Sequence, residues 1–459
     1  MNQLNLNNLN SIYLLGIGGI GMSALARYFR FAGARVSGYD RTRTPLSMEL
    51  EAEGVIIHYS EDVKKIPADT ELVIFTPAIP ADSIELQYIL SKSYPLKKRA
   101  EILGLLTLEK NAIAVAGTHG KTTTSTLIAH LFKASGTKSA AFLGGVSKNY
   151  NTNLLLSKDW EYVITEADEF DRSFMQLFPS TAVITSADAD HLDIYGSAEQ
   201  LAEAYGDFTA NIRENGTLIL REGLNILLHT KESVNVQTYS LSGPSDYYAV
   251  NTRVENGYYN FDLITPQGAL KDFKLGLPGI INVENSIAAL AVALNCGIDV
   301  EKLKNGLFSY AGVRRRFDIQ LRSESIIYMD DYAHHPEELK ACINSTRLMW
   351  PDRHITGIFQ PHLFSRTRDF ADGFAKSLDL LDSCYLLEIY PARELPIEGV
   401  DSSLIFNKME IKDKHLCDNY QLIIELEKIK PGILLTLGAG NIDQLVKPVQ
   451  QALIKKFNI

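Results

Sequence analysis

Several features that define whole classes of protein are missing from this sequence. The chain has only four cysteines, and none belongs to a Cys-x-x-Cys pair, which argues against zinc ribbons and thioredoxin-like chemistry. No apolar run approaches about 18 residues, and no basic segment followed by an apolar run opens the chain, so we expect neither a transmembrane helix nor a signal peptide. A net charge of −10 without a block of Lys and Arg argues against nucleic acid as the main partner. These absences predict a cytoplasmic protein with free thiols.

The composition is that of a folded α/β protein. The chain has 459 residues, 46% of them hydrophobic and 22% charged, which is enough for about three domains. Short apolar runs such as Ser11–Leu15 and Ala112–Ala116 alternate with amphipathic stretches, a pattern typical of βαβ units around parallel sheets. Segment 243–275 alternates more like antiparallel strands. We expect three domains, each built around a largely parallel sheet with flanking helices, over residues 1–105, 106–313 and 314–459.

A loop rich in glycine and threonine lies between the apolar run Ala112–Ala116 and a helix predicted over 124–133. It consists of Gly117, Thr118, His119, Gly120, Lys121, Thr122 and Thr123. Backbone N–H groups at a helix N-terminus bind phosphate, and glycines let the backbone approach the anion. The pattern predicts that Lys121 reaches the terminal phosphates of ATP and that the Thr122 hydroxyl ligates Mg²⁺. Val115 stands where the usual pattern has its first glycine, and a turn without a ligand is the alternative.

Acidic side chains follow two further predicted strands. The run from Glu166 to Asp171 contains four acids after one strand, and His191 lies among aspartates after the other. Acids crowded at a strand end repel one another unless a cation faces them, and Mg²⁺ takes one or two carboxylates besides phosphate oxygens and water. We therefore predict that Glu166 is a metal ligand and that His191 is a second ligand or orients one. A solvated acidic loop is the alternative.

The N-terminal strand leads into a Gly-x-Gly-x-x-Gly turn followed by a predicted helix. The turn contains Gly16, Gly18, Gly19, Ile20 and Gly21, and Asp40 ends the next strand. This pattern places a diphosphate on a helix N-terminus and an acid near a ribose or a similar group. NAD and a nucleotide-sugar diphosphate both meet these demands. Tight packing of strand on helix without a ligand is a third interpretation.

Two amides and an arginine are candidates for contacts with the nucleotide. Asn282 and Asn285 lie one turn apart near the start of an alanine-rich helix predicted from Val283 to Leu294. Their side chains either read a nucleobase edge or cap the helix. Arg316 belongs to an Arg run at the expected junction of the second and third domains, where it either closes over the γ-phosphate or lies on a solvated face.

His and Arg side chains follow two strands predicted in the third domain. Tyr332 and His334 come after the first of these strands, and His362 and Arg366 come after the second. Ligands of open α/β sheets bind outside the carboxyl ends of strands. Such groups suit an amino acid, with a cation for its carboxylate, although structural roles are equally compatible with the pattern.

Taken together, these motifs resemble the muramyl ligase family of peptidoglycan synthesis. Their order along nearly the whole chain makes the resemblance specific. The resemblance implies a Rossmann-like domain for a UDP-sugar, a P-loop ATPase-like domain for ATP and a Rossmann-like domain for an amino acid. The matching segments lie at 16–23, 117–124, 166–174, 190–193, 315–317, 330–336, 359–369 and 390–394.

The resemblance also implies a reaction and its groups. The expected reaction is ATP-dependent joining of L-alanine to the lactyl carboxylate of UDP-N-acetylmuramate through an acyl phosphate, with Mg²⁺. Lys121, Glu166 and His191 would carry catalysis, and the His and Arg side chains of the third domain would surround the alanine. Two positions depart from the family pattern, Ile281 before the first helix Asn and Leu363 after Gln-Pro-His. No lysine lies between residues 205 and 213, so we predict no carbamylated lysine there.

Three other interpretations compete with this one. A recycling ligase that adds a tripeptide to the same sugar shares most of the motifs. An NAD-dependent dehydrogenase leaves the phosphate loop unexplained, and a non-catalytic nucleotide-binding switch leaves the third domain's polar strand ends without a task. The oligomeric state stays open between a monomer and a homodimer.

Overall fold

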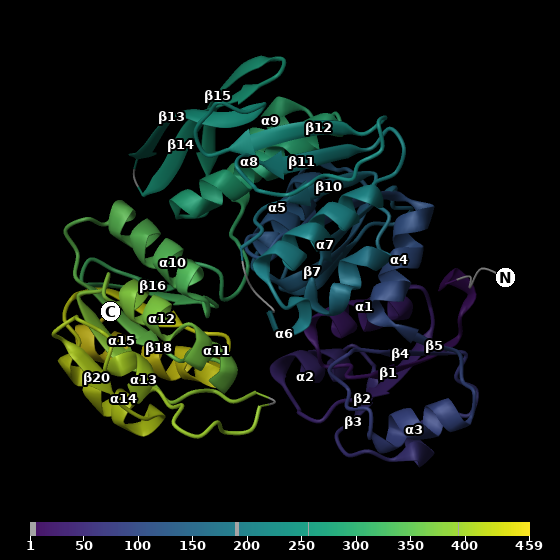
Figure 1. Cartoon of the computed structure of the whole chain (residues 1–459), viewed down its shortest axis with the longest axis horizontal. Helices are drawn as coiled ribbons and strands as arrows, with labels where there is room; N and C mark the ends of the chain where they lie inside the picture. The colour runs from purple at the N-terminus through teal and green to yellow at the C-terminus, as the bar shows by residue number, and fades with distance from the viewer. Residues whose placement is uncertain (1–5, 189–191, 256, 393) are drawn as a thin grey trace. The chain divides into compact units, whose positions relative to one another are not determined.

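The computed structural model describes residues 6–188, 192–255, 257–392 and 394–459. These residues form three sheets with flanking helices (Figure 1). The α/β class with three sheet-centred domains is therefore confirmed. Among the described helices, none combines the length and the apolar character needed to cross a membrane.

The first sheet is parallel throughout, with the strand order β3-β2-β1-β4-β5. Its strands are β1 (Ser11–Leu15), β2 (Arg35–Tyr39), β3 (Ile56–His58), β4 (Leu72–Phe75) and β5 (Leu96–Lys98). Its helices are α1 (Ile20–Phe31), α2 (Pro45–Ala52), α3 (Ile84–Ser91) and α4 (Arg99–Glu109). Strands β2 and β3 lie on one side of β1, and β4 and β5 lie on the other, so the turn after β1 lies at the switch point where open sheets bind ligands.

The second sheet has ten strands in the order β15-β14-β13-β12-β11-β10-β6-β9-β7-β8. The parallel strands β6, β9, β10, β11 and β12 form its centre, and β8 runs antiparallel to β7. Consecutive strands β13 to β15 neighbour one another, in the segment where antiparallel strands were expected. The strands are β6 (Asn111–Ala116), β7 (Ser139–Ser147), β8 (Thr152–Leu156), β9 (Tyr162–Ala167), β10 (Thr181–Ile184), β11 (Thr217–Arg221), β12 (Asn235–Ser240), β13 (Tyr247–Glu255), β14 (Tyr258–Thr265) and β15 (Gly268–Leu275). The helices are α5 (Lys121–Ser135), α6 (Leu192–Tyr195), α7 (Ala198–Ala210), α8 (Ile280–Asn295) and α9 (Val300–Ser309).

The third sheet has the order β16-β17-β21-β18-β19-β20 and is parallel except for β16. Strands β17, β18 and β21 are buried along almost their whole length, as expected where helices cover both faces. The strands are β16 (Asp318–Arg322), β17 (Ile326–Asp331), β18 (Ile355–Phe359), β19 (Ser383–Leu386), β20 (Lys414–Leu416) and β21 (Gly432–Leu437). The helices are α10 (Pro336–Met349), α11 (Phe364–Asp369), α12 (Ala371–Leu378), α13 (Ser403–Phe406), α14 (Asn419–Glu425) and α15 (Val446–Phe457).

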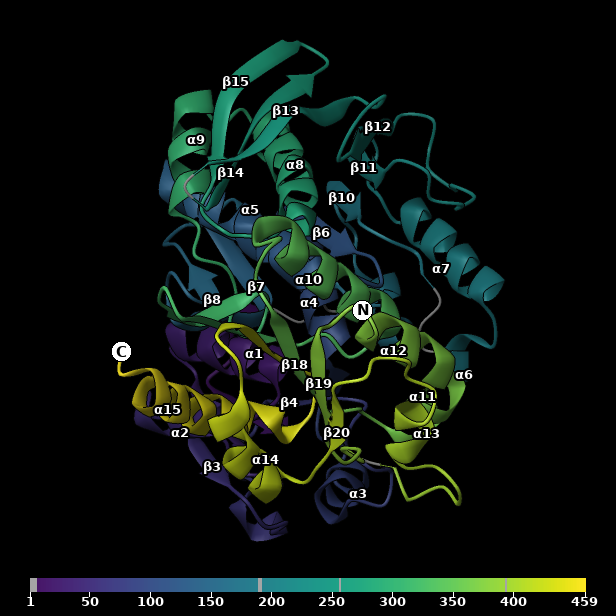
Figure 2. The same ribbon diagram turned by 90° about the vertical axis from the view of Figure 1, so that its left-hand side faces the viewer.

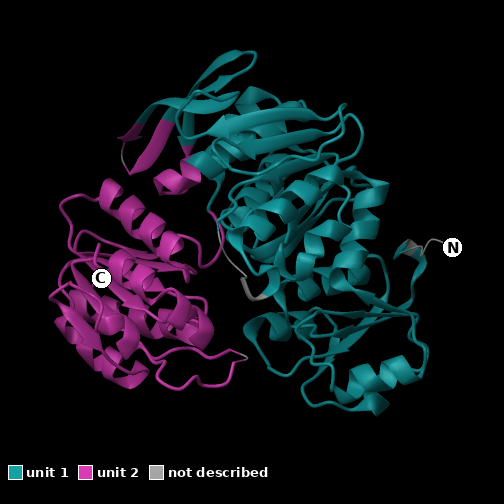
Figure 3. Cartoon of the chain, in the orientation of Figure 1, with its two compact units in different colours: residues 1–252, 261–274, 284–311 teal, residues 253–260, 275–283, 312–459 magenta. Residues whose placement is uncertain are grey.

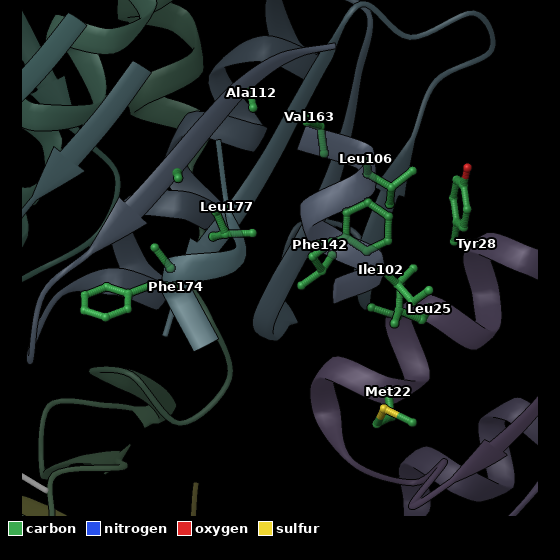
Figure 4. Packing of buried hydrophobic residues seen from close by; sticks show 14 of the residues in the cluster. Met22, Leu25, Tyr28, Ile102, Leu106, Ala112, Phe142, Val163, Phe174 and Leu177 are labelled. Atoms are coloured by element: carbon green, nitrogen blue, oxygen red, sulfur yellow. The ribbon is translucent and has the colours of Figure 1, made fainter. Parts of the chain in front are cut away.

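One hydrophobic core joins the first sheet to the second. Helix α1 lies beside β7 and β8 (Figures 1 and 2), and the ring of Tyr28 is 5.6 Å from that of Phe142. Leu25, Ile102 and Leu106 belong to the same buried cluster (Figure 4). Burying this much apolar surface at the junction holds the first two domains together.

Polar contacts reinforce the same junction. The buried guanidinium of Arg27 on α1 donates to Glu53 at 2.7–3.0 Å and to the side chain of Asn153 on β8. Asn153 in turn donates to the Ser23 hydroxyl at 2.8 Å. An arginine this deeply buried is stable only because carboxylates and an amide oxygen accept its N–H groups.

The chain divides into two compact units (Figure 3). The first unit holds the first sheet and most of the second, and the second unit holds the third sheet. The first unit comprises 1–252, 261–274 and 284–311, and the second comprises 253–260, 275–283 and 312–459. The finer domain limits expected after residues 105 and 313 remain predictions.

Candidate functional site

The phosphate loop connects β6 to α5. Gly117 and Gly120 have φ angles of 129° and 84°, left-handed values that glycine adopts without strain. Gly120 is the N-cap of α5, so the helix begins at Lys121 rather than at Thr124 as expected. The loop therefore presents its backbone at the positive end of α5, where phosphate binding is favourable.

Residues that follow β10 fix the shape of this loop. The Ser186 hydroxyl accepts a hydrogen bond from the His119 backbone N–H at 2.7 Å, and the Thr185 hydroxyl donates to the His119 carbonyl. The Thr118 hydroxyl donates to the Asp188 carbonyl at 2.8 Å. Thr118 and His119 thus anchor the loop to the neighbouring strand end, a contact that the sequence pattern did not reveal.

The Lys121 side chain lies along the loop and pairs with a buried carboxylate. Its Nζ donates to the two carboxylate oxygens of Glu169 at 2.9 and 2.7 Å and to the Gly117 carbonyl at 2.6 Å. Burial lowers the pKa of Lys121, but Glu169 and Asp168 raise it, and the net direction is upward. Lys121 therefore carries its positive charge at neutral pH. Glu169 belongs to the acidic run noted in the sequence, where it had no assigned role.

Glu166, at the end of β9, faces the first turn of α5. Its carboxylate accepts hydrogen bonds from the Thr122 hydroxyl at 3.2 Å, the Ser125 hydroxyl at 3.3 Å and the Gly144 backbone N–H at 2.8 Å. Burial raises the pKa of Glu166, and the net direction is upward although Lys121 and the hydrogen bonds from Gly144 and Thr122 lower it. The sequence identified Glu166 and Thr122 but missed Ser125 and Gly144, because strand β7 meets β9 only in the folded sheet.

The oxygens of Thr122 and Glu166 suit Mg²⁺. A hydroxyl and a carboxylate within hydrogen-bonding distance of each other are hard ligands, and Mg²⁺ held there would take phosphate oxygens and water as its other ligands. The described residues contain no cluster of three or more His, Cys, Asp or Glu that would hold a metal by itself. The predicted ligand His191 lies outside the described residues.

The remaining nucleotide candidates have different surroundings. Asn285 lies beside the phosphate loop, since a Cβ on Gly120 would be 2.9 Å from its side-chain oxygen. The Asn282 side chain donates to the Pro278 carbonyl at 2.5 Å, which ties the first turn of α8 to the segment before it, and its expected contact with the nucleotide remains a prediction. Thr123 is buried, and its carbonyl accepts a hydrogen bond from Tyr310 at 3.3 Å. The pattern thus pointed to two asparagines, and the structure puts Asn285 at the loop.

Backbone hydrogen bonds and the Asp40 carboxylate hold the glycine-rich turn after β1 in place. The backbone N–H groups of Gly16 and Ile17 donate to the Tyr39 carbonyl at 2.8 and 3.1 Å. The Asp40 carboxylate accepts from the Gly18 N–H at 2.8 Å and from the Thr42 N–H at 3.0 Å. Gly19, Ile20 and Gly21 then enter the first turn of α1. Asp40 therefore shapes the turn, and its expected proximity to a ribose remains a prediction.

Arg99 lies against this turn and was missed by the sequence analysis. It follows β5 directly, and a Cβ on Gly21 would fall within 3.0 Å of its guanidinium. Its Nη2 is 3.6 Å from the Asp168 carboxylate, in the acidic run that also contains Glu166 and Glu169. Arg99 thus connects the helix N-terminus of the first domain with the acidic run of the second. Strand β5 has only three residues, so its end gave no signal that the sequence could reveal.

In the second unit the structure brings three of the predicted amino-acid-binding residues together. The rings of Tyr332 and His334 are 5.2 Å apart, and those of His334 and His362 are 5.8 Å apart. His362 also stacks on Tyr390, with 5.8 Å between the ring centres. Tyr390 belongs to the matching segment 390–394 but was not predicted as a site residue. His334 Nδ1 lies 3.0 Å from the Tyr332 carbonyl, which fixes the orientation of its ring.

Two arginines, Arg315 and Arg316, lie over the ring of Tyr332. The Arg316 guanidinium lies 5.0 Å from the Tyr332 ring centre and 3.7 Å from Glu338. Arg366 lies on α11, whose N-cap residue Leu363 has a φ of 70°. This left-handed conformation is strained for a leucine and marks the position that departs from the family pattern. The structure thus places Arg316 beside Tyr332, and its expected contact with a γ-phosphate remains a prediction.

Comparison with known proteins agrees with this architecture. Three family models match in succession: the Mur ligase family catalytic domain over residues 11–111, the Mur ligase middle domain over 115–293 and the Mur ligase glutamate ligase domain over 315–440.

Individual relatives match along almost the whole chain. A UDP-N-acetylmuramate–L-alanine ligase of Parabacteroides distasonis is 48% identical over 460 residues, covering 99% of both chains. A protein of the same name from Flavobacterium psychrophilum is 45% identical over 457 residues, covering 99% of this chain and all of the relative. The crystal structure of the UDP-N-acetylmuramate–alanine ligase of Thermotoga maritima superimposes with a TM-score of 0.81 at 26% identity, covering 98% of this chain and 99% of that one. The resemblance seen in the sequence is confirmed: the chain belongs to the Mur ligase family.

Proposed function

We propose that this protein joins L-alanine to the lactyl carboxylate of UDP-N-acetylmuramate at the expense of ATP, in the synthesis of peptidoglycan precursors. The observation that carries the proposal is the phosphate loop with Lys121 and Thr122 at the start of α5, where the Thr122 hydroxyl lies 3.2 Å from the Glu166 carboxylate. The names of relatives that are 45–48% identical over nearly the whole chain support the choice of substrates. The cytoplasm is the proposed location, and either a monomer or a homodimer is compatible with it.

The proposed reaction has two steps. The lactyl carboxylate attacks the γ-phosphorus of ATP, the bond to the bridging oxygen breaks, and ADP leaves with that electron pair. The alanine amine then attacks the acyl carbon of the acyl phosphate, loses a proton, and inorganic phosphate leaves. Both steps need positioning and charge neutralisation rather than a protein nucleophile.

The residues of this chain have distinct proposed tasks. The backbone of the phosphate loop and Lys121 bind the ATP phosphates, and Asn282, Asn285 and Arg316 contact the nucleotide. Thr122 and Glu166, with His191, would hold Mg²⁺, whose charge offsets that of the phosphoryl oxygens.

The two other substrates are assigned to the polar strand ends of the first and third sheets. We assign the sugar diphosphate to the turn formed by Gly16, Gly18, Gly19, Ile20 and Gly21, with Asp40 beside it. We assign L-alanine to the cluster of Tyr332, His334 and His362, together with Arg366 on α11. The Arg side chain suits the carboxylate of the amino acid.

One assay tests the proposal directly. Phosphate release is measured with ATP, Mg²⁺ and UDP-N-acetylmuramate, together with single amino acids or with a tripeptide. We expect release with L-alanine and its loss in Lys121→Ala. Release with the tripeptide alone would favour the recycling ligase, and release without any dependence on an acceptor would refute amide ligation.

A further inference from the structure

The ammonium of Lys121 is fully engaged by protein acceptors. A lysine ammonium has three N–H donors. Here they meet both carboxylate oxygens of Glu169, at 2.7 and 2.9 Å, and the carbonyls of Gly117 at 2.6 Å and Thr118 at 3.4 Å. A phosphate oxygen can become a partner of Lys121 only by displacing or sharing one of these acceptors.

Glu169 is the more deeply buried partner of this ion pair. Its side chain is 1% exposed, whereas that of Lys121 is 15% exposed. The Glu169 carbonyl accepts hydrogen bonds from the Tyr195 hydroxyl at 2.6 Å and from the Arg172 N–H at 3.0 Å, which fixes its backbone. Lys121 has a long flexible stem, so in any exchange the lysine moves and the carboxylate stays.

The task of Glu169 differs from that of Glu166, three residues earlier. Glu166 faces Thr122, Ser125 and the Gly144 N–H, the groups beside the proposed metal position. Glu169 instead binds the ammonium of Lys121, the side chain proposed to bind the ATP phosphates. Glu166 is therefore placed for the proposed metal ion, and Glu169 for the lysine.

We propose that Glu169 is a positioning residue that competes with nucleotide phosphate for Lys121 and thereby weakens the retention of ADP. The inference rests on the proposed function, because it takes the phosphate loop as the ATP site. With ATP, the additional charge of the γ-phosphate draws the lysine from Glu169. Once that phosphoryl group has been transferred, the carboxylate recaptures the lysine and ADP loses a charged partner.

The proposal predicts an effect opposite in sign to that of a merely structural residue. Glu169→Gln keeps the shape of the side chain but removes the competing charge and its repulsion of phosphate. ADP should then bind about tenfold more tightly, since a hydrogen bond to a charged group is worth roughly this factor or more. If Glu169 only stabilised the loop, the same change would weaken ADP binding.

Isothermal titration calorimetry of the full-length protein with ADP and Mg²⁺ tests the proposal. The matched control is Asp171→Asn, which removes the same charge from the same run, where Asp171 pairs with Lys98 at 3.0 Å and is 38% exposed. We expect the Kd of this control to stay within about twofold of wild type because solvent screens an exposed pair. Glu169→Asp, which keeps the charge but shortens its reach, should fall between wild type and Glu169→Gln and serves as the test if Glu169→Gln does not fold.

The outcomes separate the two proposals. Failure of the wild-type protein to bind ADP would overturn the ATP assignment and this inference with it. Binding by wild type, with an equal or higher Kd in both Glu169 variants, would overturn the inference alone. Equal tightening in Asp171→Asn would also overturn it, because the effect would then reflect the charge of the run rather than the grip of Glu169 on Lys121.

Discussion

The narrow space between β7 and Glu166 gives a sharp test of the proposed metal and phosphate site. A Cβ on Gly144 would lie closer than 3.0 Å to both carboxylate oxygens of Glu166. Ordinary contact requires about 3.5 Å or more, so Gly144→Ala displaces the carboxylate by roughly 1 Å. The displaced group also loses the 2.8 Å hydrogen bond from the Gly144 N–H.

Two estimates of the effect agree. A displacement of about 1 Å in an active site lowers the rate on the order of 100-fold. Loss of a hydrogen bond to a charged acceptor costs about 1.5–3 kcal/mol, or roughly 10- to 100-fold. We therefore expect Gly144→Ala to lower kcat by one to two orders of magnitude while the fold is retained, because the neighbour that gives way is the end of a side chain.

The assay is steady-state phosphate release, with circular dichroism as the check on folding. Ser125→Ala provides a graded comparison, since it removes only a 3.3 Å hydrogen bond from the same carboxylate without any steric conflict. Its kcat should fall only a few-fold, about 1 kcal/mol. A folded Gly144→Ala variant with wild-type kcat would refute the idea that the position of Glu166 limits the reaction.

Further predictions concern the first sheet, the third sheet and the junction. Arg99→Gln should raise the KM for UDP-N-acetylmuramate about tenfold with little change in the KM for ATP, because a charged group is lost beside the glycine-rich turn; equal changes in both constants would contradict this role. Burial raises the pKa of Asp330 to about 6, so the native state holds a proton that the unfolded chain releases, and stability should fall as the pH rises from about 4 to about 6. The free energy of unfolding should fall by about 3 kcal/mol between pH 4 and pH 7, and urea denaturation should show that Asp330→Asn abolishes this fall. An equal dependence of stability on pH in the wild-type protein and the variant would contradict the assignment. Arg27→Ala should cost about 2 kcal/mol of stability, measured by thermal unfolding, because it leaves Glu53 and Asn153 without their partner; an unchanged Tm would refute it.

Much of the fold could be predicted from the sequence because its strands are short, apolar and followed by polar or glycine-rich turns. Strand β1 matches the predicted run Ser11–Leu15 residue for residue, and β6 extends the predicted run Ala112–Ala116 by one residue. Helix starts were less accurate. Helix α8 begins at Ile280, three residues before Val283, and α5 begins at Lys121. Helical periodicity reveals the middle of a helix, whereas its first turn depends on caps such as Gly120.

The site was predictable where chemistry and backbone lie in one segment. Lys121 and Thr122 belong to such a segment, and so does Glu166 at the end of its strand. Arg99 and Gly144 were not predictable, because their relevance comes from contacts with Gly21 and Glu166, far away in the sequence. Nothing local distinguishes such residues from an ordinary surface arginine or strand glycine.

The common core beneath α1 and β7 has a consequence for how such an enzyme can diversify. Because the first two sheets are built into one unit, the proposed sites for the sugar diphosphate and for ATP are inherited as a single block. The aromatic and histidine cluster belongs to the other unit, with a core of its own. With the amine assigned to that cluster as proposed, substitutions there change which amine is accepted and leave the proposed sites for carboxylate activation intact. Acceptor choice and carboxylate activation are therefore separately evolvable properties of one chain.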